Sequence, residues 1–201
     1  SDNQPLFQVP SESAMRALVA TFVRKLNARA SPGFDMIAAP FIKYAVKLIP
    51  RESGRGTEHF NVLVPLLAQL FRLFMRKACI PDGWKVAKIT PLYKKGQLLD
   101  PGNYRMLAVN GTLYRLYANV LREVVTDWCK AEHKIPDAQF GFYPGRNTLQ
   151  PMFILRHLKH AAKVKKKHLH VAFIDFKQAY DTVPRANLWE HLRRIGMPAH
   201  M

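Results

Sequence analysis

The sequence is poor in cysteine and lacks the spacings of a metal-binding scaffold. Its two cysteines, Cys79 and Cys129, are far apart in 201 residues, which argues against a disulfide framework or a cysteine-rich zinc finger. No histidine pair has HExxH or zinc-finger spacing. The longest apolar stretch, residues 60–71, contains polar residues and a proline and falls short of the roughly 20 residues of a membrane span. Residues 1–4 do not resemble a signal peptide. No segment is amphipathic and lipid-like beyond ordinary core helices, so we expect no membrane partner.

Acidic residues are also scarce. The chain has 31 Lys and Arg against 14 Asp and Glu, a net charge of +17. No acidic residue occurs between Asp137 and Asp175. Hydrophobic residues make up 48%, enough for a folded core. A surplus this large attracts polyanions, with nucleic acid as the first candidate and an anionic membrane surface as the second.

Apolar residues recur at helical spacing in several segments. We expect helices after Ser11 to about Leu26, from Pro40 to Leu48, Phe60 to Lys77, Gly111 to Lys130, Thr148 to Lys163 and Arg185 to Ile195. Ser11 or Ser13 can cap the first helix. Residues 51–59 are polar and predict a mobile loop.

Strands are expected in two places. Residues 84–93 and 104–109 are rich in β-branched, aromatic and basic residues and flank a loop with two glycines and a proline, which predicts a basic hairpin. Residues 169–176 form a short apolar run typical of a largely buried strand. Helices, a hairpin, helices, a strand and a helix in this order indicate an α+β fold.

Asp175 is the informative residue of that apolar run. A carboxylate in a buried strand costs several kcal/mol unless it is paired, protonated or bound to a cation. A strand that ends at a cleft would let Asp175 hold Mg²⁺, which prefers hard oxygen ligands. A structural ion pair with one of the many Lys or Arg residues is the alternative.

The string around Asp175 resembles a known motif. Ala172-Phe173-Ile174-Asp175-Phe176-Lys177-Gln178-Ala179-Tyr180-Asp181 is similar to the first catalytic motif of reverse transcriptases, specifically those of non-LTR (LINE-like) retrotransposons. Further segments resemble that family in its order: Ser31–Asp35, Ile80–Trp84 with Ile89–Gly96, Asn103–Arg105, and Gln139–Phe142 with Gly145–Thr148.

The resemblance implies a fold and a domain order. The chain is similar to the fingers and the beginning of the palm of a right-hand polymerase, mostly helical with a basic hairpin and a short palm sheet. It implies an N-terminal helical extension at 1–30, a fingers-like region at 31–138, and the fingers–palm junction with a truncated palm at 139–201.

The resemblance also implies site residues. Asp175 would be the catalytic, metal-binding carboxylate, and the carbonyl of Phe176 would also face the magnesium. Nucleotide-binding positions would be Lys94, Arg105, Gln139, Gly141, Phe142 and Tyr180. The alternatives are a solvated hairpin face for Lys94 and Arg105, with Lys95 the register alternative to Lys94, and a packed core tyrosine for Tyr180. Asp181 is expected to be structural.

Other basic residues fit the phosphate backbone of a nucleic acid. These nucleic-acid-binding candidates are Lys95, Arg146, Lys163, Lys165, Lys166 and Lys167. A solvated charge run is the alternative for the lysines between 163 and 167.

Two departures from the family matter. Met106 follows Tyr104-Arg105 where the family has proline. The family's later Asp-Asp motif has no counterpart, since no Asp-Asp pair occurs in the chain, and the thumb is also missing. Because one carboxylate cannot position two magnesium ions, we expect this chain alone neither to bind Mg²⁺ stably nor to polymerise.

Two functions remain open from the sequence. The first is the nucleic-acid-binding portion of a reverse transcriptase, acting on RNA and RNA–DNA duplexes, with another protein segment covering the truncated palm. The second is a domesticated, non-enzymatic RNA-binding protein of a ribonucleoprotein such as an organellar ribosome, with rRNA and ribosomal proteins as partners. Either protein would be intracellular, in the nucleus or an organelle such as the mitochondrion.

Overall fold

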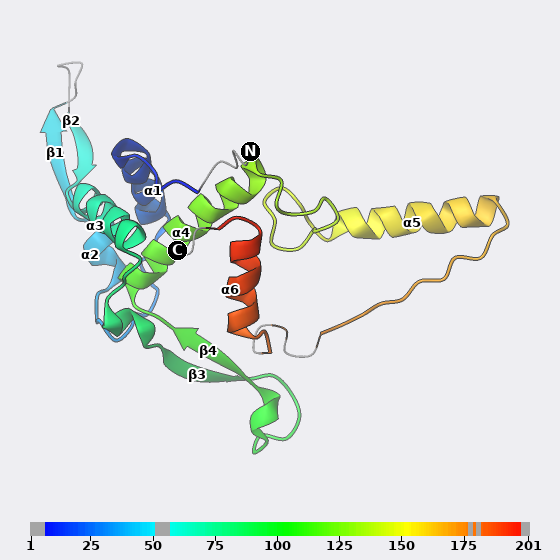
Figure 1. Cartoon of the computed structure of the whole chain (residues 1–201). Coiled ribbons are helices and arrows are strands. Elements are labelled where there is room, and N and C mark those ends of the chain that lie inside the picture. The colour runs from blue at the N-terminus through cyan, green and yellow to red at the C-terminus, as the bar shows by residue number, and fades with distance from the viewer. Residues whose placement is uncertain (1–6, 51–56, 177–178, 180–181, 198–201) are drawn as a thin grey trace. The chain divides into compact units, whose positions relative to one another are not determined.

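The computed structural model describes residues 7–50, 57–176, 179 and 182–197 (Figure 1). Its described residues form two compact units, one up to Asp127 and the other from Trp128 to Met197. The elements in chain order are α1 (Glu12–Lys25), α2 (Ala39–Lys43), β1 (Val46–Pro50), β2 (Thr57–Asn61), α3 (Leu63–Lys77), the 3₁₀ turn η1 (Asp82–Lys85), β3 (Lys88–Tyr93), the 3₁₀ turn η2 (Pro101–Asn103), β4 (Tyr104–Val109), α4 (Thr112–Ala131), α5 (Leu149–Val164) and α6 (Arg185–Arg194).

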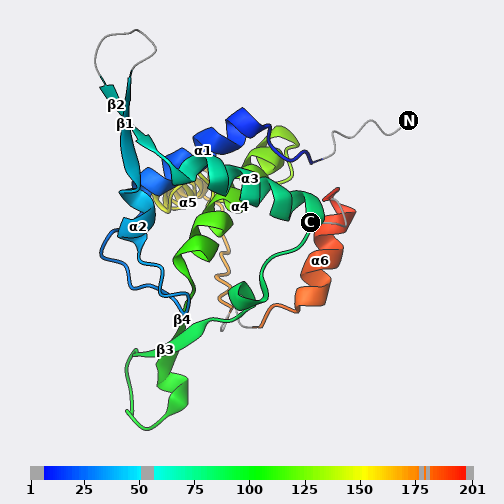
Figure 2. The same ribbon diagram turned by 90° about the vertical axis from the view of Figure 1, so that its left-hand side faces the viewer.

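The first unit has a helical core. Figures 1 and 2 show α1 alongside α3, and the Phe71 ring of α3 packs edge-on against Tyr117 of α4 with centroids 5.2 Å apart. The apolar stripes that predict these helices supply the buried residues: Met15, Val19, Val23, Leu67, Phe71, Met75, Leu116, Val120 and Val124. Burial of such stripes stabilises amphipathic helices.

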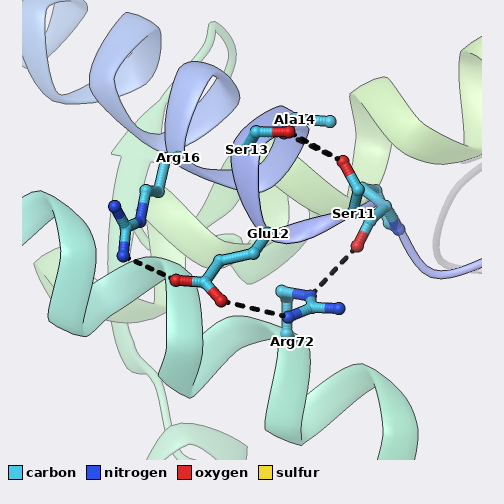
Figure 3. A network of polar contacts seen from close by, with 7 residues as sticks. Ser11, Glu12, Ser13, Ala14, Arg16 and Arg72 are labelled. Atoms are coloured by element: carbon cyan, nitrogen blue, oxygen red, sulfur yellow. Dashed lines mark hydrogen bonds and ion pairs between the residues drawn. The ribbon is translucent and has the colours of Figure 1, made fainter.

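The start of α1 is capped and tied to α3 (Figure 3). Ser11 Oγ accepts the Ala14 N–H at 3.2 Å, as the sequence predicts for an N-cap. The Glu12 carboxylate forms two ion pairs. Its Oε1 lies 2.5 Å from Arg16 Nη2 of the same helix, and its Oε2 lies 4.0 Å from Arg72 Nη1 of α3. Arg72 Nε also donates to the carbonyl of Pro10 at 3.0 Å. The Arg72 guanidinium therefore joins the chain before α1 to the middle of α3.

The helix predicted over residues 40–48 is shorter than expected. Only α2 forms there, and residues 46–50 become β1, which pairs antiparallel with β2. Val46, Leu48 and Ile49 suit a strand once a partner is present. The pairing partner comes from residues 57–61, part of which we expected as loop.

Asn61 explains why α3 begins later than predicted. Its side-chain oxygen accepts the Leu63 N–H at 3.0 Å, and its Nδ2 donates to the Ile42 carbonyl at 2.7 Å. Asn61 is thus the last residue of β2, and its side chain caps the start of α3 and donates a hydrogen bond to a carbonyl of α2.

The second unit contains α5 and α6, and neither helix has a buried residue. The predicted buried strand over residues 169–176 is wrong for this structure: the segment is irregular, and Phe173 and Ile174 are 84% and 83% exposed. A strand needs a neighbour for its backbone hydrogen bonds, and no described segment pairs with this one. Its β propensity alone cannot supply that partner.

The mixture of helices and two two-stranded sheets agrees with the expected α+β class. The assignment to fingers and palm, with boundaries after 30 and 138, stays a prediction. Within the residues described, no helix combines the length and apolarity that crossing a bilayer requires.

Candidate nucleic-acid interface

The basic hairpin forms as the sequence predicts. β3 and β4 pair antiparallel, with Tyr93 opposite Tyr104. The pairing continues one step further, because the Lys94 backbone N–H donates to the Asn103 carbonyl at 2.8 Å. This step carries the regular alternation of side chains to Lys94.

That alternation places the hairpin cations. Arg105 lies opposite Leu92, and Lys94 follows Leu92 by two residues, so Lys94 and Arg105 share one face. Lys95, one residue on, lies in the bend beyond the last paired residue. All three side chains are exposed, and none has an acidic partner in the described part of the chain. The face with Lys94 and Arg105 therefore carries unneutralised positive charge that suits an anion.

The loop at the end of the hairpin is held by side chains. The hydroxyl of Tyr93 donates to the Gly96 carbonyl at 2.6 Å, and that of Tyr104 donates to the Leu98 carbonyl at 2.7 Å. Gly96 has a φ of +102°, which favours glycine. These bonds give the loop a defined conformation next to the Lys94–Arg105 face.

An aromatic cluster anchors the hairpin at its base. Trp84, on η1 just before β3, makes edge contacts with Phe74 at 5.3 Å and Tyr114 at 6.0 Å, and a tilted contact with Tyr117 at 5.7 Å. Aromatic contacts in this range each add stabilisation beyond buried area. Trp84 thereby joins the hairpin to α3 and α4.

In the second unit, Arg146 organises the predicted nucleotide-binding loop. Its Nη1 donates to the carbonyls of Pro136 and Gln139 at 2.8 and 2.7 Å, and its Nη2 meets Asp137 Oδ1 at 2.9 Å. The guanidinium also stacks on the Tyr143 ring at 4.2 Å, and the side chain is only 18% exposed. Arg146 thus bonds its own loop, and its nucleic-acid contact stays a prediction.

The three other candidates of this loop lie close in sequence. Gln139 Nε2 donates to the Gly141 carbonyl at 3.0 Å. Phe142 has a left-handed φ of 61° and is 95% exposed. An exposed ring with this strained backbone is uncommon. The Phe142 ring is thus exposed on the Arg146-bonded loop.

The predicted basic segment lies at the end of α5. The helix ends through Lys166, whose φ is 49°, with the Lys166 N–H bonded to the Lys163 carbonyl and the Lys167 N–H to the Ala162 carbonyl. This is a Schellman-type end. Lys163, Lys165, Lys166 and Lys167 are all exposed and lie at the negative end of the helix dipole, which favours cations there.

Asp175 is exposed and lies in an irregular segment of the second unit. The expectation of a buried carboxylate is therefore wrong for this structure, because the strand that would bury it does not form. Phe176 is exposed as well. Tyr180 and Asp181 lie outside the described residues.

Comparison with known proteins decides the family. The family described as reverse transcriptase (RNA-dependent DNA polymerase) matches residues 92–201, more than half of the chain. The chain belongs to the reverse transcriptase family. The matched residues run from the hairpin through the Asp175 motif, as the sequence resemblance predicts.

The relatives of this reverse transcriptase chain come from retrotransposable elements of the non-LTR kind. It is 25% identical over 175 residues to the probable RNA-directed DNA polymerase from transposon BS of Drosophila melanogaster, covering 86% of this chain and 18% of that protein. It is 25% identical to the Pol polyprotein of element R2 of Popillia japonica (73% and 21% coverage) and to the RNA-directed DNA polymerase of mobile element jockey of D. melanogaster (90% and 18%). The chain thus spans about a fifth of the length of these relatives.

The described residues of this reverse transcriptase chain do not by themselves fit a magnesium ion. No group of three or more His, Cys, Asp or Glu residues gathers around Asp175 or elsewhere in the described segments. One carboxylate and water hold Mg²⁺ weakly. The metal-binding role of Asp175 therefore stays a prediction.

The sequence missed the junction between the segment Ser31–Asp35 and the start of α4. Thr112 is fully buried, and its hydroxyl donates to the Ile37 carbonyl at 2.7 Å. Arg115 Nη2 donates to the Ser31 carbonyl at 3.0 Å. The Gly33 and Gly111 backbones lie against each other. The only signal for this junction is a pair of glycines, one in the Ser31–Asp35 turn and one just before the helix.

Proposed function

We propose that this chain is the nucleic-acid-binding and nucleotide-binding part of an RNA-directed DNA polymerase, comprising its fingers and the beginning of its palm. The observation that carries the proposal is the placement of Lys94 and Arg105 on one face of a hairpin whose loop is held by two tyrosine hydroxyls. Family membership supports the reaction class.

In this proposal the hairpin cations hold the triphosphate of the incoming nucleotide. A lysine ammonium supplies a compact charge, and an arginine guanidinium donates two parallel hydrogen bonds to phosphate oxygens. The hairpin can present both at once because they lie on the same face. Gln139, Gly141 and Phe142 would line the nucleotide pocket, and Tyr180 would lie under the sugar and exclude a 2′-hydroxyl.

Lys95 provides a matched control for Lys94. The two residues are adjacent and carry equal charge, yet Lys94 is the last paired residue of the hairpin and Lys95 lies in the bend that follows. Lys94→Gln is expected to weaken nucleotide binding about tenfold, the value of one charge-assisted hydrogen bond. Lys95→Gln is expected to leave nucleotide binding unchanged while weakening the binding of RNA.

The experiment measures both affinities on the 201-residue chain. Fluorescence anisotropy with a labelled RNA–DNA template–primer gives the affinity for nucleic acid. Titration with a labelled deoxynucleoside triphosphate gives the affinity for the nucleotide. Equal effects of Lys94→Gln and Lys95→Gln on nucleotide binding would contradict the assignment of Lys94.

We also propose that the chain alone does not extend a primer, because it lacks an Asp-Asp pair. A primer-extension assay with Mg²⁺ tests this directly. Measurable extension that disappears in Asp175→Ala would overturn the proposal.

A non-enzymatic RNA-binding role is the second candidate, supported by the exposed lysines at the end of α5. Binding through these lysines requires neither Asp175 nor a nucleotide. It predicts that a Lys165→Gln, Lys166→Gln, Lys167→Gln triple variant loses most RNA affinity, whereas Lys94→Gln and Arg105→Gln change nothing. The polymerase proposal predicts that both sets of variants weaken their respective ligands.

A further inference from the structure

A pocket of about 330 Å³ lies in the first unit, where the end of α1 meets α4. Three cations line it: Lys25 of α1, and Arg115 and Arg122 of α4. Asn27 and Asn119 also line it, with one Asn119 Nδ2–H donated to the Arg115 carbonyl at 2.8 Å and the other left over, and none of the described residues lining the pocket is acidic. It lies outside the hairpin and outside every motif that the sequence singles out.

The α4 side of the pocket is a polar stripe. Arg115, Asn119 and Arg122 are spaced i, i+4, i+7 and so share one face of the helix. Arg115 is fixed in place, because its Nη2 donates to the carbonyl of Ser31 at 3.0 Å and lies 3.2 Å from Thr112 Oγ1. These bonds use one nitrogen and leave Nε and Nη1 as donors for a ligand.

The α1 side adds a cation and little negative charge. Lys25 Nζ lies 5.7 Å from the Phe22 ring and has no acidic partner among the described residues. The Leu26 carbonyl at the end of α1 would repel an anion, but it already accepts Lys43 Nζ at 2.8 Å. Arg122 is exposed and likewise lacks an ion pair in the described segments.

Three cations around one hollow repel one another unless an anion joins them. Phosphate fits best, since guanidinium groups and amide N–H groups match its several acceptor oxygens. The pocket is at the lower end of the volume range of ligand sites, enough for a phosphate with its sugar. It is open to solvent, so a strand can enter and leave.

We propose that this pocket binds a backbone phosphate of a nucleic-acid strand. The proposal rests on the proposed function, because it adds a second point of contact for the same class of ligand. It assigns Lys25, Arg115 and Arg122 to strand binding, and it predicts that nucleic acid bound at this pocket is held through its backbone without base selectivity.

The test compares two double variants of the 201-residue chain with equal charge change. Lys25→Gln with Arg122→Gln removes two cations of the pocket. Arg24→Gln with Lys77→Gln removes two exposed cations of the same unit that do not line it. Arg115 is left unchanged because it also anchors Ser31. Circular dichroism melting confirms that both variants fold.

The probe is a labelled single-stranded RNA, titrated by fluorescence anisotropy between about 50 and 200 mM salt. The pocket variant is expected to bind about tenfold more weakly than the control variant. The slope of its log affinity against log salt should become shallower by about 0.7 for each phosphate that the pocket no longer neutralises. Equal losses of affinity in the two variants would overturn the proposal.

Two further results separate the alternatives. If the unchanged chain does not bind RNA at low salt, the proposed function itself fails. The alternative that the pocket binds a free phosphate ion is tested with inorganic phosphate, whose binding is followed by phosphorus NMR. If the pocket variant loses phosphate binding but keeps full RNA affinity, the pocket is a small-anion site and the strand assignment is wrong.

Discussion

The backbone of Gly33 lies directly against the backbone of Gly111. A Cβ atom at position 33 would stand 2.4 Å from the Gly111 nitrogen. Gly111 directly precedes α4, and a Cβ atom there would come 2.5 Å from the Asp35 carboxylate. Two residues without side chains thus let the segment Ser31–Asp35 reach the helix that carries Arg115.

Gly33→Ala should therefore destabilise the first unit by about 1–3 kcal/mol, the range for forced overpacking, because the atom it meets is backbone and cannot turn aside. Gly83→Ala is the matched control, since a Cβ atom there meets nothing within 4 Å and should change stability by less than about 0.5 kcal/mol. Urea unfolding followed by circular dichroism measures both. Equal midpoints for the two variants would contradict the close approach.

The hairpin loop should loosen when its tyrosine hydroxyls are removed. Tyr93→Phe and Tyr104→Phe each delete one hydrogen bond to a loop carbonyl, worth about 0.5–1.5 kcal/mol. The double variant should show faster amide hydrogen exchange in residues 95–102 and weaker nucleotide binding. Tyr44→Phe is the control, because Tyr44 is exposed and its hydroxyl makes no hydrogen bond to the described residues. Unchanged exchange in the double variant would show that the hydroxyls do not hold the loop.

Local patterns predicted α1, α3, α4 and the hairpin well. Residues 63–77 and 112–131 carry a strong apolar stripe, and residues 88–109 contain their own turn and both strands. In these segments the partners lie close in sequence, so the pattern contains nearly all of the information. The same holds for the Ser11 cap.

The rest depends on contacts between distant segments. Residues 46–50 become a strand because residues 57–61 pair with them. Residues 169–176 stay irregular, because no described segment pairs with them. The candidate site also depends on contacts between segments. Motif resemblance predicted Lys94 and Arg105 as candidates, and the pairing of β3 with β4 then placed both on one face of the hairpin. The pocket of Lys25, Arg115 and Arg122 joins segments about 90 residues apart, which no local pattern reveals.

Lysine should not replace Arg146 without loss of local stability. The Arg146 guanidinium donates hydrogen bonds to two carbonyls and to the Asp137 carboxylate at once, and an ammonium cannot reproduce that planar geometry. Arg146→Lys should lower the free energy of local opening of residues 136–147 by about 1–3 kcal/mol, measured by native-state hydrogen exchange. Arg156→Lys, on the exposed surface of α5, should leave that segment unchanged. If Arg146→Lys retains full protection, the charge alone suffices and the hydrogen-bond geometry is unimportant.

Tyr117 should make the fold sensitive to alkaline pH. It is only 7% exposed, and burial raises the pKa of its phenol above the ordinary value of about 10. The folded chain then keeps a proton that the unfolded chain has lost, so the free energy of unfolding falls as pH rises above about 10 and is unaffected by this group at lower pH. Tyr117→Phe should reduce that fall.

Urea unfolding at about pH 8 and about pH 11 measures the difference between the two chains. Burial also raises the pKa of the Cys129 thiol, so both chains should carry Cys129→Ala to remove that contribution. Lysine titration is common to both chains and cancels in the comparison. The expected result is a smaller loss of stability at high pH in Tyr117→Phe, with the aromatic contacts to Phe71 and Trp84 retained. Parallel pH dependence in the two chains would show that the Tyr117 phenol ionises equally well in the folded and the unfolded state.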